Sequence, residues 1–191
     1  MRTVTEIPEI GTARLRLRGW RSEHLAPFAA MNADPAVMRH LGGPQTRRAS
    51  DLAVGRFLEK WAEEPRFGWW AVEDRATGRF LGLAGLGTPD FDCPPAPCVE
   101  IGWRFVPDAW GQGLATEAAL ACLAHGFATV GLAEIVAFAL PENRRSLAVM
   151  ARIGMVEDPG AAFEHPLVER GPRRHLVHRR RRAAWQAGQD G

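Results

Sequence analysis

The stretch WGQGLATEAALACLAHGF, residues 110–127, has the residue types and spacing that point most directly to chemistry. Gly111, Gly113 and Ala115 alternate with larger residues just before an unbroken helical pattern. A strand that feeds such a turn into a helix presents a cluster of main-chain N–H groups, and the helix dipole adds positive charge. The small residues let a phosphate approach the main chain without meeting a Cβ atom. A tight turn that needs glycine for positive φ explains the same spacing equally well.

Two familiar nucleotide-binding patterns do not fit this turn. A dinucleotide fingerprint requires G-x-G-x-x-G, with an acidic residue about 20 positions later. Here the third glycine of that pattern is absent, and the turn lies mid-chain, after other predicted strands. A Walker loop requires G-x-x-x-x-G-K-[ST], and the turn contains no lysine. Both patterns are therefore weak candidates.

Glu100 lies on the predicted strand VEIGWRFVP, residues 99–107, which leads into the turn. Along a strand, Glu100, Gly102 and Arg104 share one face. An amine is protonated at neutral pH, so acyl transfer to it requires a base, and a carboxylate acting directly or through water would serve. The alternative is a structural glutamate paired with an arginine on a solvated face, and the sequence leaves both interpretations open.

Asn143 and Ser146 stand three residues apart, so both project near the first turn of one predicted helix. Asparagine is a good N-cap residue, and a serine in a first helical turn needs no functional explanation. The spacing alone therefore does not distinguish a cap from a site.

Taken in order, the segments EIGWRFVPDAWGQGLATEA and PENRRSLAVMARIGM resemble the GCN5-related N-acetyltransferase (GNAT) superfamily. The segments TARLRLR and FEHPLVERGPRRHLVHR are similar to the branch that contains the ribosomal-protein alanine/serine N-terminal acetyltransferases. The resemblance runs from Ala13 to Arg180, which is nearly the whole chain.

The resemblance implies acetyl-CoA as co-substrate, with its pyrophosphate on the turn, and no metal. The superfamily loop reads Arg/Gln-x-x-Gly-x-Gly/Ala, and Trp110 stands at the Arg/Gln position, a departure common in this branch. Because main-chain amides would carry most of the pyrophosphate binding, the presence of Trp110 at this position casts little doubt on that binding. The cofactor-binding candidates in the turn are Gly111, Gln112, Gly113, Leu114, Ala115 and Thr116.

The resemblance also implies roles for residues on either side of the turn. Main-chain N–H groups at Phe105 and Val106 would hold the pantetheine arm and polarise the thioester carbonyl, as an oxyanion hole does. Asn143 would contact the pantetheine or the substrate, Ser146 would protonate the departing thiolate, and Glu100 would act as base. The amine would attack directly in a ternary complex.

These residues need a scaffold, and the chain predicts an α/β (α+β) fold of the GNAT type. We expect a mixed central sheet of about seven strands with a splayed pair, flanked by about four helices. The predicted strands cover residues 13–20, 67–74, 78–87, 99–107, 133–140 and 175–180. One domain would span residues 10–182, followed by a flexible tail over residues 183–191.

Two predicted helices precede the central strands. Ser22 looks like the N-cap of the first, and Pro27 limits that helix to its early turns. The second starts near Ser50, with Leu52, Phe57, Leu58 and Trp61 along one side.

Composition describes an ordinary globular chain of 191 residues with a net charge of +2, which argues against a nucleic-acid partner. The basic run from His178 to Arg182 is best explained as a solvated, charged terminus. Three cysteines, Cys93, Cys98 and Cys122, show no metal-ligand spacing. Cys93 and Cys98 flank a proline-rich loop and could pair with each other, but we expect reduced thiols. With no signal peptide or membrane span, we expect a cytoplasmic protein. The excess of arginine over lysine suggests a bacterial, G+C-rich source.

The sequence thus predicts an N-acetyltransferase that moves an acetyl group from acetyl-CoA to a primary amine. The acceptor stays open between a protein N-terminus, a polyamine, an aminoglycoside and a small amino compound, and a homodimer is also left open. One alternative is a non-catalytic CoA-binding or regulatory module with the same fold. Another is a ribosome- or RNA-associated protein that uses the arginine-rich terminus.

Overall fold

The computed structural model describes residues 7–166 and 173–188 and confirms a mixed α/β fold. These residues form nine strands and six α-helices. The strands are β1 (Ile10–Gly11), β2 (Leu15–Arg18), β3 (Trp69–Asp74), β4 (Phe80–Gly87), β5 (Glu100–Phe105), β6 (Glu134–Ala139), β7 (Val156–Glu157), β8 (Phe163–Glu164) and β9 (Arg174–Arg181). The helices are α1 (Ser22–Ala33), α2 (Pro35–Met38), α3 (Arg47–Glu63), α4 (Leu114–Ala124), α5 (Arg144–Arg152) and α6 (Arg182–Ala187).

The chain divides into two compact units. Unit 1 comprises Met1–Gly85 and Trp103–Ala121, and unit 2 comprises Leu86–Gly102 and Cys122–Gly191. The strands β4 and β5 and the helix α4 each begin in one unit and end in the other. Within the described residues, no helix has both the length and the apolar character that a membrane span requires.

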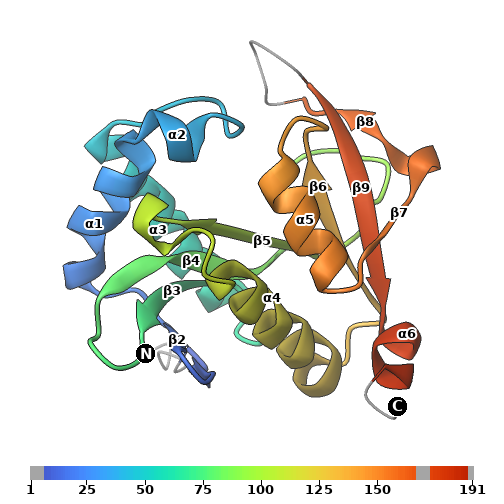
Figure 1. Ribbon diagram of the computed structural model, residues 1–191, viewed down its shortest axis with the longest axis horizontal. Coiled ribbons are helices and arrows are strands. Elements are labelled where there is room, and N and C mark those ends of the chain that lie inside the picture. The colour runs from blue at the N-terminus through green and yellow to red at the C-terminus, as the bar shows by residue number, and fades with distance from the viewer. Residues whose placement is uncertain (1–6, 167–172, 189–191) are drawn as a thin grey trace. The chain divides into compact units, whose positions relative to one another are not determined.

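In unit 1 the strands follow the order β1, β2, β3, β4, β5, and neighbours from β1 to β4 are antiparallel. Helices α1 and α3 pack against each other, and α2 follows α1 directly (Figure 1). Their apolar side chains meet those of the strands in one core, in which Trp20, Phe28 and Phe80 are buried. At Gly82 a Cβ atom would lie 2.1 Å from the carbonyl oxygen of Arg104, so a glycine is required for β5 to approach β4.

The helix α3 begins three residues before the predicted start. Thr46 is its N-cap, and the Thr46 hydroxyl accepts a hydrogen bond from the N–H of Ala49. Its buried side carries Ser50, Val54 and Trp61, while Leu52 and Leu58 are 55% and 43% exposed. The predicted apolar side was therefore wrong for these two leucines, because the helix turns the 50–54–61 row toward the core.

The helix α1 differs from its prediction at both ends. Its N-cap is Arg21 instead of Ser22, and the Nδ1 atom of His24 accepts a hydrogen bond from the Arg21 N–H. The helix also continues past Pro27 to Ala33. Burial of Phe28, Met31 and Asn32 on its inner side offsets the hydrogen bond that the proline cannot donate.

The strand predicted within residues 13–20 is present as β2, and one of its arginines lies inside unit 1 instead of in solvent. Arg18 is buried, and its guanidinium pairs with the carboxylates of Glu9 and Glu73. Glu73 also accepts a hydrogen bond from the Nε2–H of His24, at 2.8 Å. This cluster of complementary charges lets three ionisable side chains lie inside unit 1.

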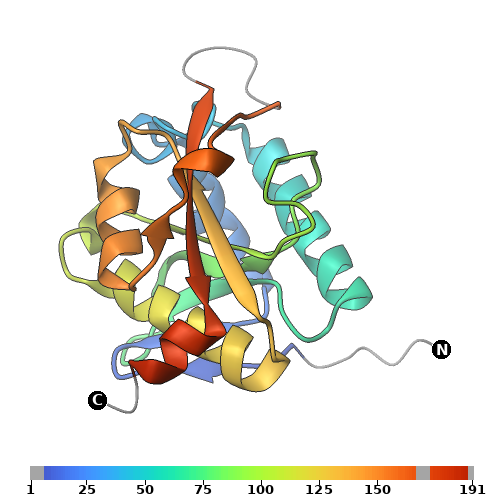
Figure 2. The same cartoon turned by 90° about the vertical axis from the view of Figure 1, so that its right-hand side faces the viewer.

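Unit 2 is built on β9, which pairs antiparallel with β6, β7 and β8 (Figure 2). The first part of β5 pairs in parallel with β6, with Glu100 opposite Val136. The helix predicted after the glycine turn is present but is not of one type throughout. After α4 it continues as a π-helix over His125–Val130 and ends at Gly131, where φ is 82°.

The structure describes a helix at the start of the segment for which the sequence predicts a flexible tail, residues 183–191. Residues Arg182–Ala187 form α6, and the ring of Trp185 packs 5.5 Å from that of Phe127. Of the preceding arginines on β9, Arg179 pairs with both Glu134 and Asp158, and Arg181 pairs with Glu134. An aromatic contact across the chain therefore orders this helix, which local sequence could not reveal.

Candidate functional site

The glycine turn adopts a backbone that its residues require. Gly111 and Gly113 have φ values of 75° and 76°, in the left-handed region that favours glycine. A Cβ atom at Gly111 would meet nothing within 4 Å, and one at Gly113 would meet only the Arg14 side chain, at 3.7 Å. Thus the glycines set the turn's shape and also leave open space above its main chain, which is what a bound phosphate needs.

The turn leads directly into α4. At the start of this helix the N–H of Glu117 donates a hydrogen bond to the carbonyl of Gly113. The preceding N–H groups, of Leu114, Ala115 and Thr116, have no acceptor among the described residues. Gln112 directs its side-chain amide back to the Asp108 carbonyl, at 2.6 Å. The free N–H groups and the helix dipole together favour an anion here.

A polar network fixes the start of α4. The carboxylate of Glu117 accepts hydrogen bonds from the Thr12 hydroxyl, the Arg14 N–H and the Arg14 guanidinium. Although burial opposes the effect, these bonds lower the pKa of Glu117 below its ordinary value. The Arg14 guanidinium also donates to the carbonyl of Gln112. The sequence does not reveal this network, because Thr12 and Arg14 lie about a hundred positions from Gln112 and Glu117.

A hollow of about 470 Å³ lies beside the turn in unit 1. Its lining includes two arginines together with residues of the turn. The lining residues are Ala13, Arg14, Asp74, Arg75, Ala76, Gln112 and Leu114. The space suits a ligand at the turn, but the charge of the lining is mixed, because Asp74 also lines the hollow and Arg14 pairs with Glu117.

The end of β5 separates the two predicted oxyanion donors. The N–H of Val106 donates to the carbonyl of Leu81 at 2.9 Å, so it is engaged within unit 1. Because N–H directions alternate along an extended chain, the N–H of Phe105 points to the opposite edge of the strand. Phe105 is therefore the better placed of the two to donate to a ligand, while its carbonyl accepts from the indole of Trp110.

In unit 2, Glu100 is half-buried at the start of β5, and its carboxylate has no hydrogen-bond or ion-pair partner within the described ranges. Burial, reinforced by the negative charge of Asp90, raises the pKa of Glu100 to about 7. The arginine-paired interpretation of this glutamate does not describe the structure. A carboxyl group with a pKa near neutrality can accept and release a proton under physiological conditions.

Two thiols lie on the loop that precedes Glu100. Cys93 and Cys98 are half-buried, carry free thiols and pack against the cluster around Phe163. Burial raises the pKa of Cys98 to about 12, so this thiol is protonated at neutral pH. It is accordingly a poor nucleophile.

The helix α5 carries the other predicted pair in unit 2. Asn143 is its N-cap, and the side-chain oxygen of Asn143 accepts a hydrogen bond from the Ser146 N–H at 3.3 Å. The cap therefore fixes the position of Ser146 in the first turn. The Ser146 hydroxyl is half-buried and makes no hydrogen bond to the part of the chain that the structure describes. A free hydroxyl of this kind is available to donate a proton.

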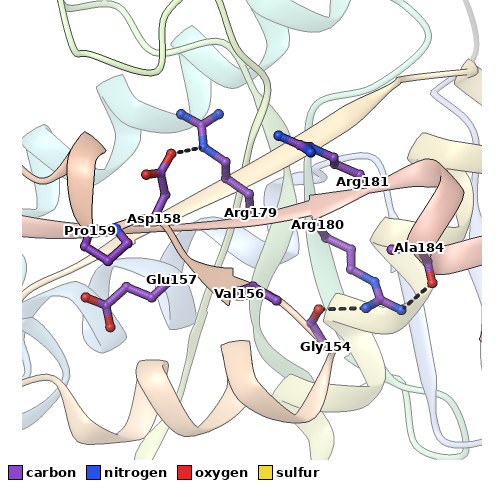
Figure 3. Close-up of a pocket in the computed structure, with 9 residues that line it drawn as sticks. All are labelled: Gly154, Val156, Glu157, Asp158, Pro159, Arg179, Arg180, Arg181 and Ala184. Carbon is purple, nitrogen blue, oxygen red and sulfur yellow. Dashed lines mark hydrogen bonds and ion pairs between the residues drawn. The ribbon is translucent and has the colours of Figure 1, made fainter.

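A second hollow, of about 420 Å³, lies in unit 2 but contains none of these residues (Figure 3). Arg179 and Arg180 point to opposite sides of β9 in this view. Arg179 pairs with Asp158, and Arg180 donates to the carbonyls of Gly154 and Ala184. Since protein groups already engage these arginines, the hollow offers a ligand little uncompensated charge.

Unit 1 thus carries the predicted donor-binding residues Phe105, Val106 and 111–116, and unit 2 carries Glu100, Asn143 and Ser146. The N–H of Val106 is already engaged, so of the two predicted strand donors only Phe105 is placed to donate to a ligand.

Comparison with known proteins identifies the family. Residues 14–156 match the family model described as an acetyltransferase (GNAT) domain. An FsC-acetyl coenzyme A-N(2)-transacetylase from Aspergillus fumigatus is 33% identical over 160 residues, covering 80% of this chain and 67% of the relative.

Solved structures agree with this assignment. An acetyltransferase from Agrobacterium tumefaciens superposes with a TM-score of 0.76 at 28% identity, over 92% of this chain and 95% of its own. A ribosomal-protein-S5-alanine acetyltransferase from Vibrio fischeri shares the fold, with a TM-score of 0.73 at 15% identity over 93% and 98% of the two chains. The family model covers most of the sequence, and the chain therefore belongs to the GNAT acetyltransferase family.

Proposed function

We propose that this protein transfers an acetyl group from acetyl-CoA to a primary amine, of either a small molecule or a protein N-terminus. The observation that carries the proposal is Glu100, a half-buried carboxylate with no partner in the described residues and a pKa raised to about 7. Family membership supports the acetyl donor. The name of the Aspergillus fumigatus relative supports acetyl coenzyme A as donor and a nitrogen as acceptor.

In the proposed reaction, Glu100 takes a proton from the acceptor ammonium, directly or through water. The free amine attacks the acetyl carbonyl, so that a C–N bond forms as the C–S bond breaks. The N–H of Phe105 stabilises the oxyanion. The Ser146 hydroxyl gives its proton to the departing thiolate and regains one from the newly acylated nitrogen, which leaves a neutral amide. The N–H groups of Leu114, Ala115 and Thr116 hold the pyrophosphate, and Asn143 positions Ser146.

The proposed setting is the cytoplasm, because free thiols at Cys93, Cys98 and Cys122 suit a reducing compartment. Direct attack by the amine also agrees with the state of Cys122. Because this thiol is fully buried and its pKa is raised, it does not supply a reactive thiolate that could carry the acetyl group.

A thiol-release assay with acetyl-CoA and a panel of amines tests the proposal. Ser146→Ala should slow turnover at least about 10-fold while changing CoA affinity little, because a general acid acts only on the leaving group. Ser22→Ala, at the exposed start of α1, is the matched control. Unchanged turnover in Ser146→Ala would remove this hydroxyl from the mechanism.

A different result would point to the non-catalytic alternative. If CoA raises the Tm but no amine in the panel causes thiol release, the protein binds the donor without transferring the acetyl group. The same assay therefore separates an enzyme from a CoA-binding regulatory module.

A further inference from the structure

Arg104, near the end of β5, is a charged side chain that the proposed reaction leaves unexplained. Its Nη1 atom donates to the side-chain oxygen of Asn32, and its Nε atom is buried without a hydrogen-bond partner in the described residues. The same residues supply no carboxylate to pair with it. The guanidinium is thus held within unit 1 without a counter-charge.

The group that holds Arg104 is itself fixed by neutral hydrogen bonds. Asn32 and Ser50 are both 0% exposed, and the Asn32 amide donates to the Ser50 hydroxyl at 3.0 Å. The Ser50 hydroxyl donates to the carbonyl of Thr46, and the Asn32 carbonyl accepts from the N–H of Gln45. The Asn32 side-chain oxygen is therefore fixed toward Arg104. The arrangement orients the cation without neutralising it.

A guanidinium that is withdrawn from water without a counter-charge lowers the stability of the folded protein. Burying a charge without a partner carries a large desolvation penalty, and proteins usually pair such groups. Burial lowers the pKa of Arg104 to about 10, which still leaves the guanidinium charged at neutral pH. An anion supplied by a ligand would remove the penalty and would be bound strongly for the same reason.

The position of Arg104 on its strand indicates which ligand brings the anion. By the two-residue alternation of a strand, Arg104 lies on the side of β5 that carries Glu100, while Ile101 and Phe105 are buried on the other side. Glu100 is the proposed base for the acceptor amine. The donor turn in unit 1 contacts Arg14, not Arg104. Hence the acceptor, and not the donor, is the expected source.

We propose that Arg104, oriented by Asn32 and Ser50, binds a carboxylate of the acceptor, so that preferred acceptors are amines that also carry a carboxylate. This inference rests on the proposed acetyl transfer. It narrows the acceptor from any primary amine to amino acids and similar small amino-carboxylates.

The test compares a series of ω-amino acids, from glycine to 8-aminooctanoate, with their primary amides in the thiol-release assay. For the best chain length, the wild-type protein should prefer the acid over its amide about 10- to 100-fold in kcat/KM, the range expected for a hydrogen bond to a charged group. Arg104→Gln should bring this ratio close to one, mainly through KM. Arg16→Gln, which removes an exposed arginine of β2, should leave the ratio unchanged.

Asn32→Asp provides a second variant that keeps the arginine. It places a carboxylate where Asn32 now accepts from Arg104, so the guanidinium gains an internal counter-ion. The preference for the acid should disappear although Arg104 is present, and the Tm should not fall. A merely structural role for Arg104 would leave the acid-to-amide ratio of Asn32→Asp at the wild-type value.

Several outcomes would overturn the inference while leaving the acetyl transfer intact. These are a wild-type ratio near one at every chain length, a ratio that survives Arg104→Gln, and a loss of affinity in that variant for CoA but not for dephospho-CoA. The last result would assign the guanidinium to the donor's phosphate.

If no amine releases thiol, the proposed function fails and the carboxylate site is tested by binding. N-acetylated ω-amino acids should then raise the Tm of the wild type but not of Arg104→Gln, and their amides should raise neither. No stabilisation of the wild type by these acids would overturn the site.

Discussion

Two glutamates, one in each unit, show how differently the protein treats a buried carboxylate. Glu73 in unit 1 is 4% exposed and is bound by the His24 imidazole and the Arg18 guanidinium. Glu100 in unit 2 is half-buried, has no partner in the described residues, and has the negative charge of Asp90 nearby. A paired buried charge stabilises a fold, whereas a buried charge left without a partner is typical of a site that performs chemistry.

Two arginines repeat the contrast within unit 1. Arg18 contacts the carboxylates of Glu9 and Glu73, whereas Arg104 contacts only the neutral amide of Asn32 in the part of the chain described. Arg18 is buried and Arg104 is half-buried, and only Arg18 has a counter-charge among the described residues. The comparison of the two glutamates leads to opposite predictions: substitution of Glu100 should affect catalysis, and substitution of Glu73 should affect stability.

The largest expected effect is on catalysis by Glu100→Gln. Removing a general base should lower kcat about 10²- to 10⁴-fold while leaving CoA affinity unchanged. Steady-state thiol release and a separate CoA titration measure the two quantities. If kcat stays within about threefold of the wild type, Glu100 is not the base and its missing partner has another explanation.

The pH dependence of kcat/KM gives a second, smaller effect. The base works only when deprotonated, so activity should fall about tenfold per pH unit below the raised pKa of about 7 and level off above it. The acceptor's own ionisation affects wild type and Glu100→Gln alike, so the ratio of their pH profiles isolates Glu100. A ratio that is constant from pH 5 to pH 9 would contradict the assignment.

Glu73→Gln should behave in the opposite way. It keeps an acceptor for His24 but removes the charge that faces Arg18, and should cost about 2 kcal/mol of unfolding free energy. Urea unfolding measures this loss, and kcat of the folded variant should stay close to that of the wild type. A large fall in kcat without a loss of stability would place Glu73 in the chemistry and undo the comparison.

The smallest effect distinguishes strain from function in the glycine turn. Gly78 and Gly113 have φ values of 72° and 76°, so alanine at either position should cost about 1 kcal/mol of stability. Only Gly113→Ala should also weaken CoA binding, because its Cβ occupies the space above the proposed pyrophosphate site. Equal CoA affinities in the two variants would leave the turn with a purely structural role.

Local patterns predicted much of this structure. The strand that carries Glu100, the glycine turn and the Asn143 cap of α5 all depend on neighbouring residues, and each appears where the sequence places it. The prediction for Leu52 and Leu58 failed because several helical faces were apolar enough to be buried, and only packing selects among them.

What the sequence could not supply depends on contacts between distant residues. The burial of Arg18 depends on Glu73, 55 positions away, and α6 on the contact between Trp185 and Phe127. The missing partner of Glu100 is likewise a property of the folded chain. Sequence reasoning therefore identified the candidate base, but its alternative, an arginine-paired glutamate, could be set aside only with the structure.

The contact of Glu117 with Thr12 and Arg14 has a consequence for the thermodynamics of donor binding. These bonds tie the glycine turn and the first turn of α4 to residues 12–14. A phosphate that binds there therefore orders little of the chain and loses little affinity to conformational entropy. The Glu117 carboxylate that holds the turn is itself negative, so the proposed binding of CoA would depend on the preformed shape of the turn more than on an excess of local positive charge.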